Sequence, residues 1–205
     1  MPRESSNPET AAETLLDRLF DADVLVADDE GRDDAYRDGE GRDGEGRDDA
    51  DRDGEGRDGE GHDDEVLDLT AEFRADWRRR MDHLRDRDPT SYLGLYRGTD
   101  PDALEFASSG LGVVVAREGE PVGRWPSEAA MLADVAAYSL CDELVAGWHE
   151  FPSAQRDELV ARLRAFMNRC PACGEAVVAR DRDEGALPRL RCEGCEATLL
   201  GEGRE

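Results

Sequence analysis

The sequence lacks several features that would indicate a function at once. No stretch approaches the roughly 18 consecutive apolar residues that a membrane helix needs, which argues against a membrane protein. The first ten residues contain no apolar segment typical of a signal peptide. A phosphate-binding glycine loop, a nucleophile elbow and a metalloprotease motif are also absent. We therefore expect a soluble, cytoplasmic protein without membrane contacts, and no enzyme class is indicated.

Basic residues are scarce, and lysine is missing altogether. The 205 residues include 51 Asp and Glu but only 26 basic residues, all of them Arg, for a net charge of −25. Residues 28–65 contain 6 Arg and 19 Asp or Glu, a net charge of −13, and the remaining chain carries −12. An acid excess over the globular segments, with Arg in place of Lys, resembles the proteins of extreme halophilic archaea. The resemblance implies molar salt, in which the Debye length is about 3 Å or less and acidity says little about partners.

Residues 28–65 contain a five-residue repeat, RDGEG, in which an arginine recurs from Arg32 to Arg57. Tyr36 is the only aromatic residue, so the segment cannot bury enough apolar surface to offset the entropy lost on ordering. We predict a disordered linker. A calcium-loop pattern, D-x-D-x-D-G-x5-E, is matched here by Asp49, Asp51, Asp53, Gly54 and Glu60. No amphipathic helix flanks this match, so we favour weak cation condensation over a specific calcium site.

The rest of the chain predicts an α+β fold, a small domain of helices and a β-hairpin that ends in a zinc ribbon. Apolar residues at helical spacing indicate helices over 8–20, 71–87, 91–96 and 140–148, and after Ser127 and Ser153. Strands are indicated at 24–26 and 66–69, which we expect to pair across the repeat, and in a hairpin of 111–116 with 122–125. Trp125 and Trp148 are expected in the core.

Four domain segments follow from these elements. Residues 1–27 supply the first helix and strand of the α+β domain, and residues 28–65 form the linker. Residues 66–168 supply the remainder of the α+β domain, and residues 169–205 form the zinc ribbon.

Four cysteines form the most informative motif. Cys170 and Cys173, followed by Cys192 and Cys195, make two C-x2-C pairs that 18 residues separate. Two residues between cysteines allow a tight turn to direct both sulfurs at one metal, and the amide N–H groups of the turn can donate to the thiolates. Two such turns supply a closed tetrahedral site of four sulfurs, which suits one structural Zn²⁺. Short strands at 177–179 and 190–191 can pair between the turns.

This arrangement resembles the zinc-ribbon family over residues 168–200, including the ribbons of transcription-associated proteins. Disulfides are disfavoured without a secretion signal, and a thioredoxin-like redox pair lacks its βαβ context. An Fe–S cluster or bound iron is the remaining alternative. With the preceding α+β region, the chain resembles uncharacterised haloarchaeal proteins that end in a CPxCG zinc ribbon. That resemblance covers about 8–26 and 66–200 and implies no known activity.

Arginines indicate where a partner would bind. The possible nucleic-acid contacts within the ribbon are Arg180, Arg182, Arg189 and Arg191. Pairing of these side chains with Asp181, Asp183 and Glu184 is the alternative. The helix over 71–87 carries six more arginines, which we interpret as a solvated helix face rather than a phosphate site.

Cys141 and His149 are the remaining candidates for chemistry. A catalytic pair of cysteine and histidine requires spatial proximity. Because Cys141 lies on an apolar helix, we favour a buried small hydrophobic side chain instead.

Together these observations predict a non-enzymatic zinc-ribbon protein that binds nucleic acid or the transcription machinery. The first alternative is a protein–protein adaptor with a purely structural zinc site. The second is an enzyme with its site in residues 70–150.

Overall fold

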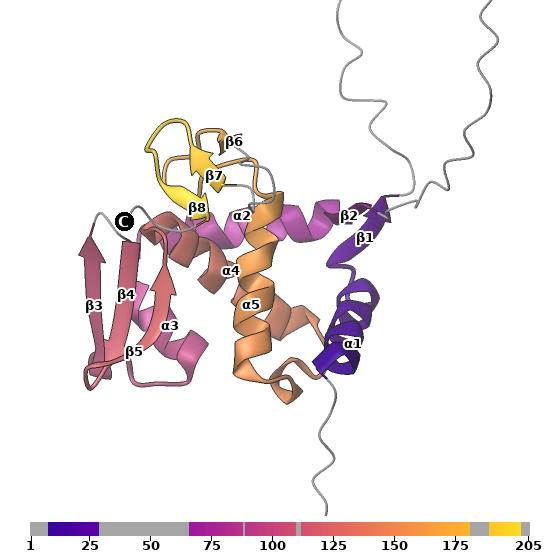
Figure 1. Cartoon of the computed structure of the whole chain (residues 1–205), viewed down its shortest axis with the longest axis horizontal. Helices are drawn as coiled ribbons and strands as arrows, with labels where there is room; N and C mark the ends of the chain where they lie inside the picture. The colour runs from indigo at the N-terminus through magenta and orange to yellow at the C-terminus, as the bar shows by residue number, and fades with distance from the viewer. Residues whose placement is uncertain (1–7, 29–65, 88, 110–111, 181–188, 202–205) are drawn as a thin grey trace, which may run out of the picture.

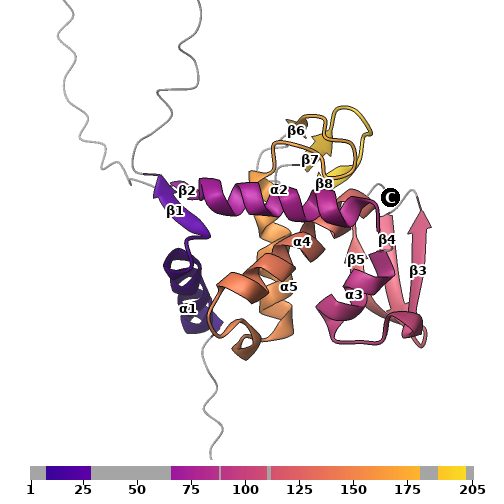
Figure 2. The same cartoon turned by 180° about the vertical axis from the view of Figure 1, so that it is seen from behind.

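A computed structural model describes residues 8–28, 66–87, 89–109, 112–180 and 189–201 (Figures 1 and 2). Helices α2 (Ala71–Arg85), α4 (Glu128–Leu144) and α5 (Ser153–Leu163) occupy the middle of the molecule. Small antiparallel sheets surround these helices, so the predicted α+β class is confirmed. None of the described helices has the length and apolarity required to cross a membrane.

A two-stranded sheet joins the segments on either side of the repeat. β1 (Leu25–Asp28) and β2 (Val66–Leu69) are antiparallel, with Leu25 opposite Leu69, and this confirms the predicted pairing. The repeat after Asp28 lies outside the described residues, together with the predicted linker and the calcium-loop match. Before β1, helix α1 (Pro8–Asp21) buries Leu15 and Leu19.

Helix α2 forms one wall of the core. It begins after Thr70, whose side-chain oxygen accepts a hydrogen bond from the amide of Phe73 at 3.2 Å. It ends at Arg85, two residues before the predicted end. Its buried side chains recur at helical spacing, and they are Phe73, Trp77, Met81 and Leu84. The indole of Trp77 also donates to the carbonyl of Ala133 at 2.9 Å, which joins α2 to α4.

The region after α2 contains more regular structure than the sequence predicts. Helix α3 (Pro89–Arg97) starts at the proline and extends the predicted turn over 91–96. β4 (Gly112–Arg117) and β5 (Glu120–Trp125) form the predicted hairpin, and β3 (Leu104–Ser109) adds an unpredicted strand beside β4. Because β3 is an edge strand and its alternate side chains are exposed, its apolar signal is weak.

Helix α4 is continuous, whereas the sequence indicated two helices divided near residue 140. Neither glycine nor proline interrupts residues 128–144, so nothing in the backbone stops the helix there. Ser127 caps its start, since the side-chain oxygen accepts from the amide of Ala130 at 3.1 Å. Short 3₁₀ turns η2 (Trp148–Glu150) and η3 (Arg164–Phe166) follow α4 and α5. Trp125 and Trp148 are both buried in the core, as predicted.

Candidate metal centre

The four predicted metal ligands come together in the ribbon. The Sγ atoms of Cys170, Cys173, Cys192 and Cys195 all lie within 4.8 Å of one another. Two short separations cross between the C-x2-C turns: 3.6 Å from Cys170 to Cys195 and 3.3 Å from Cys173 to Cys192. All four are free cysteines. The structure thus brings together the whole ligand set that the spacing predicts.

These sulfur positions fit a tetrahedral metal ion. With metal–sulfur bonds of about 2.3 Å, the sulfur–sulfur edge of a tetrahedron is about 3.8 Å. The separations of 3.3 and 3.6 Å are close to this edge. They are much longer than the about 2.05 Å of a disulfide bond. The cluster can therefore hold one metal ion through four thiolates.

The two cysteine turns share one backbone plan. The amide of Cys170 donates to the carbonyl of Glu175 at 2.8 Å, and the amide of Cys192 donates to the carbonyl of Ala197 at 3.0 Å. In each turn the acceptor lies five residues after the donor. The repetition places the two sulfur pairs in equivalent positions around the same point.

A left-handed residue follows the second cysteine of each turn. Gly174 has φ 80° and Glu196 has φ 58°. Only glycine adopts this conformation without steric cost, so Glu196 carries local strain. The guanidinium of Arg191 donates to the carbonyl of Glu196 at 3.0 Å, which helps to hold the strained turn.

The surroundings separate the acidities of the thiols. A hydrogen bond from the Glu175 amide lowers the pKa of Cys173 to about 7. Burial raises the pKa of Cys170 to about 12. Amide donors at the sulfurs are what the tight-turn geometry predicts. Since a metal binds thiolates, Cys173 is the ligand that is most readily deprotonated before binding.

The ribbon contains three strands, one more than predicted. β6 (Val177–Arg180) pairs with β7 (Arg189–Cys192), which confirms the predicted strand pair. β8 (Thr198–Leu200) pairs with the other edge of β7. The unpredicted β8 carries Leu199, whose side chain is fully buried.

The ribbon is packed firmly against the helices (Figure 1). Side chains from three helical segments donate to its backbone carbonyls at 2.6 Å each: Arg85 to Pro171, Ser127 to Thr198, and Arg164 to Leu199. Four ribbon residues belong to the same buried cluster as the helices: Cys170, Leu190, Cys192 and Leu199. The metal centre is therefore continuous with the core of the α+β region.

The predicted arginine strip is partly described. In the ribbon sheet, Arg180 lies directly opposite Arg189, and Val178 lies opposite Arg191. Alternation along β7 places Arg189 and Arg191 on one face, whereas Leu190 and Cys192 between and after them are buried. The three arginines therefore share the outer face of the ribbon. Arg182, with Asp181, Asp183 and Glu184, lies outside the described residues.

Most arginines of α2 form contacts within the protein. Four form ion pairs with neighbouring carboxylates: Arg74 with Asp68, Arg79 with Asp76, Arg80 with Glu143, and Arg85 with Asp82. Arg78 donates to the Asn168 side chain at 3.0 Å. These contacts neutralise the helix and tie it to α4 and the start of the ribbon.

The described hydrogen bonds and ion pairs of His149 go to Asp142 and Arg156 and do not include Cys141. Cys141 is fully buried, and burial raises its pKa to about 12. His149 is exposed and lies 2.6 Å from the carboxylate of Asp142. A buried thiol with a raised pKa is a poor nucleophile, because the thiolate is the reactive form. Cys141 is instead the small buried side chain that the apolar helix indicates.

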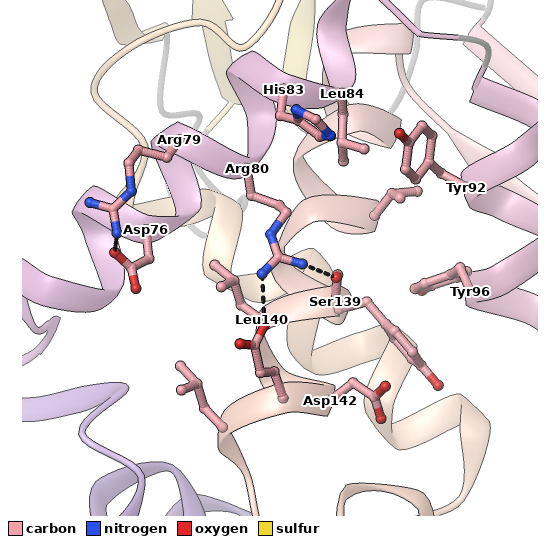
Figure 3. A pocket seen from close by; sticks show the side chains of 14 residues that line it. Asp76, Arg79, Arg80, His83, Leu84, Tyr92, Tyr96, Ser139, Leu140 and Asp142 are labelled. Carbon is pink, nitrogen blue, oxygen red and sulfur yellow. Dashed lines mark hydrogen bonds and ion pairs between the residues drawn. The ribbon is translucent and has the colours of Figure 1, made fainter.

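A cleft of about 760 Å³ lies between α2, α3 and α4 (Figure 3). Arg79 pairs there with Asp76, and Arg80 donates to Ser139 at 2.6 Å and to Glu143 at 2.7 Å. The charged groups of its walls thus largely satisfy one another. The residues that line this cleft fall within 70–150, and neither Cys141 nor His149 is among them.

A buried ion pair was not predicted from the sequence. Asp134 on α4 lies 3.0 Å from the guanidinium of Arg164, and the indole of Trp125 donates to its other oxygen at 2.9 Å. Burial raises the pKa of Asp134 to about 7. A signal was available, because Asp134 is the only acidic residue between Glu128 and Asp142 in an otherwise apolar helix. A lone carboxyl in such a segment usually requires a partner.

Fold and site together define an α+β protein whose ribbon carries a four-cysteine cluster that can hold a metal. A family model described as the central domain of a family of unknown function (DUF8054) matches residues 59–165, more than half of the chain, and the protein belongs to this family. The match includes the cleft between α2 and α4 but ends before the four clustered cysteines. No curated protein and no solved structure matches the chain.

Proposed function

We propose that the protein is a non-enzymatic zinc-ribbon protein that binds nucleic acid through the outer face of the ribbon. One structural Zn²⁺ would be held by Cys170, Cys173, Cys192 and Cys195. The acid excess and the use of Arg in place of Lys further suggest that it works in a salt-loaded cytoplasm.

Zinc is the ion that the ligand set suits best. Four thiolates are soft ligands, and a tetrahedral arrangement of four sulfurs matches the preference of Zn²⁺ or of iron–sulfur centres. All four positions of the tetrahedron come from protein, so a bound zinc ion would stabilise the fold and would not activate water.

The observation that carries the nucleic-acid proposal is the register of β6 and β7. It places Arg180 directly opposite Arg189, with Arg191 on the same face. Like charges directly opposite each other destabilise a sheet by tenths of a kcal/mol. No described carboxylate pairs with Arg180 or Arg189. A phosphate between the two guanidinium groups would remove this repulsion, and the exposed pair is therefore suited to a nucleic-acid backbone.

Metal content tests the first part of the proposal. We expect about one equivalent of zinc in the full chain purified under reducing conditions, and a loss of metal in Cys192→Ser. Less than about half an equivalent of zinc or iron would contradict the site.

Binding tests the second part. Fluorescence anisotropy with labelled double-stranded DNA and single-stranded RNA should show affinity that falls steeply with salt. The double variant Arg180→Gln with Arg189→Gln should reduce the slope of log K against log salt by about 2. The matched control changes Arg117 and Arg124, exposed on the β3–β5 sheet, to Gln and should bind normally.

Two results would contradict nucleic-acid binding. One is the absence of binding to both probes at the lowest salt that keeps the chain folded. The other is an equal loss of affinity in the ribbon variant and in the control, which would show only a nonspecific effect of net charge.

A further inference from the structure

Exposed apolar side chains gather on the first helix and strand of the protein. Among the described residues, the large hydrophobic side chains that are more than a third exposed are Leu16, Phe20, Val26 and Leu144. The first three belong to α1 and β1, and their exposures are 39%, 37% and 43%. Leu16 and Phe20 are one turn apart on α1, and Leu16 also lines a groove.

A groove beside these residues separates α1 from α5. It has a volume of about 620 Å³, and α1, β1, β2, α5 and η3 contribute to its walls. Figures 1 and 2 both show α1 beside α5, well away from the ribbon. Leucine side chains dominate both helical walls, with Leu15 and Leu19 on α1 and Leu159 and Leu163 on α5. We call this feature the α1–α5 groove.

The helical walls determine which shape would fill the α1–α5 groove. Leu15, Leu19 and Leu163 are buried and form the floor of the groove, whereas Leu16 on α1 and Leu159 on α5 remain accessible on its two walls. The space between two helical walls accepts the apolar ridge of a third helix. An amphipathic helix with apolar residues at positions i, i+3, i+4 and i+7 has this form.

The charge beside the α1–α5 groove indicates which charged side chains should flank the apolar face of that helix. Asp17, Asp21 and Asp23 are exposed on and just after α1, and no described cation forms an ion pair with them. The cations nearby are already engaged, because Arg18 donates to the Ala146 carbonyl at 2.8 Å and Arg162 pairs with Glu158. The uncompensated charge at this wall is negative, and basic side chains would complement it through ion pairs at contact distance, which salt screens less than longer-range attraction.

We propose that the α1–α5 groove binds a basic amphipathic helix of a partner protein. Leu16 and Phe20 contact its apolar face, and Asp17 and Asp21 attract arginine or lysine side chains that flank that face. The site is independent of the ribbon and of the metal.

The test uses the full chain and three labelled peptides of about 14 residues, four helical turns each. The first places Leu at i, i+3, i+4 and i+7 with Arg and Ala elsewhere. The second has Glu in place of Arg, and the third is a scrambled version of the first. We expect the first peptide to bind most tightly by fluorescence anisotropy, at the lowest salt that keeps the chain folded.

Protein variants then locate the binding site. Leu16→Ser and Phe20→Ser should each weaken the first peptide about tenfold, because each removes an apolar contact of leucine or phenylalanine size. Leu144→Ser changes an equally exposed leucine outside the groove and should have no effect. Asp17→Asn with Asp21→Asn, which leaves the apolar contacts intact, should weaken the first peptide and flatten its salt dependence.

Three outcomes would overturn the proposal. The first is equal binding of the basic and acidic peptides, or no binding of either. The second is full affinity in Leu16→Ser while thermal unfolding shows that the variant is folded. The third is a dimer of the wild-type chain in light scattering that Leu16→Ser dissociates, since the occupant would then be a second copy.

Discussion

Leu199 provides a direct test of whether the ribbon and the helices form one core. Its side chain is fully buried on β8. Its own carbonyl accepts a hydrogen bond from Arg164, and the carbonyl of the preceding Thr198 accepts one from Ser127. Changing a buried leucine to alanine costs about 2–5 kcal/mol, because apolar contacts are lost and a cavity remains. For a chain of this size each kcal/mol lowers the melting temperature by about 2–4 °C. We therefore expect Leu199→Ala to lower it by roughly 4–20 °C.

Leu144→Ala is the matched control for this prediction. Leu144 is 43% exposed on α4, so the same chemical change should alter the free energy of unfolding by only about 0.5 kcal/mol. Thermal unfolding of the metal-loaded protein followed by far-UV circular dichroism reports mainly on the helices. If Leu199→Ala left the helical transition in place and released only the metal, the ribbon would be a separate unit and our reasoning would be wrong.

Three further predictions concern buried or anchoring groups. Burial raises the pKa of Asp134 from 3.8 to about 7, so its stabilising contribution is complete below pH 3.8 and is lost as the pH rises through about 7. Asp134→Asn should therefore flatten the fall in stability between about pH 4 and pH 7 in denaturant titrations, and an unchanged slope would contradict this. Because burial raises the pKa of Cys141 to about 12, its thiol should react with a disulfide reagent only after unfolding, even when the metal has been removed. Rapid reaction in the folded state would show that Cys141 is accessible. Arg85→Ala should lower stability by about 1 kcal/mol and speed metal release to a chelator, because the Arg85 guanidinium holds the Pro171 carbonyl at 2.6 Å. The exposed Arg87→Ala serves as its control, and equal effects of the two changes would argue against a specific anchor.

Local signals predicted much of the fold. The stripe of Phe73, Trp77, Met81 and Leu84 predicted α2 because helical periodicity alone places these residues on one face. The hairpin of β4 and β5 followed from two apolar runs around the turn at Glu118 and Gly119, where both residues have positive φ. β3 was missed because its alternate side chains are exposed, and β8 was missed because three residues are too few to show a periodic pattern. Both are edge strands, and pairing with a neighbouring strand stabilises them.

The metal ligands were the clearest prediction from sequence. A C-x2-C pair is a local motif, since two intervening residues suffice to place both sulfurs on one side of a turn. Two such pairs can meet whenever the strands between them form a hairpin. The residues alone therefore define the four-cysteine cluster and its fit to one tetrahedral metal, as well as the uneven distribution of charge along the chain.

Contacts between distant segments required the folded protein. Arg164 reaches both Asp134 and the carbonyl of Leu199, and no spacing in the chain indicates that these groups meet. The same holds for the α1–α5 groove, whose two walls come from opposite ends of the sequence. Periodicity shows which face of a helix is apolar, but not which partner covers it or whether it stays open. Burial against other elements decides this, and so the docking of the ribbon and the open apolar groove are properties of the tertiary structure.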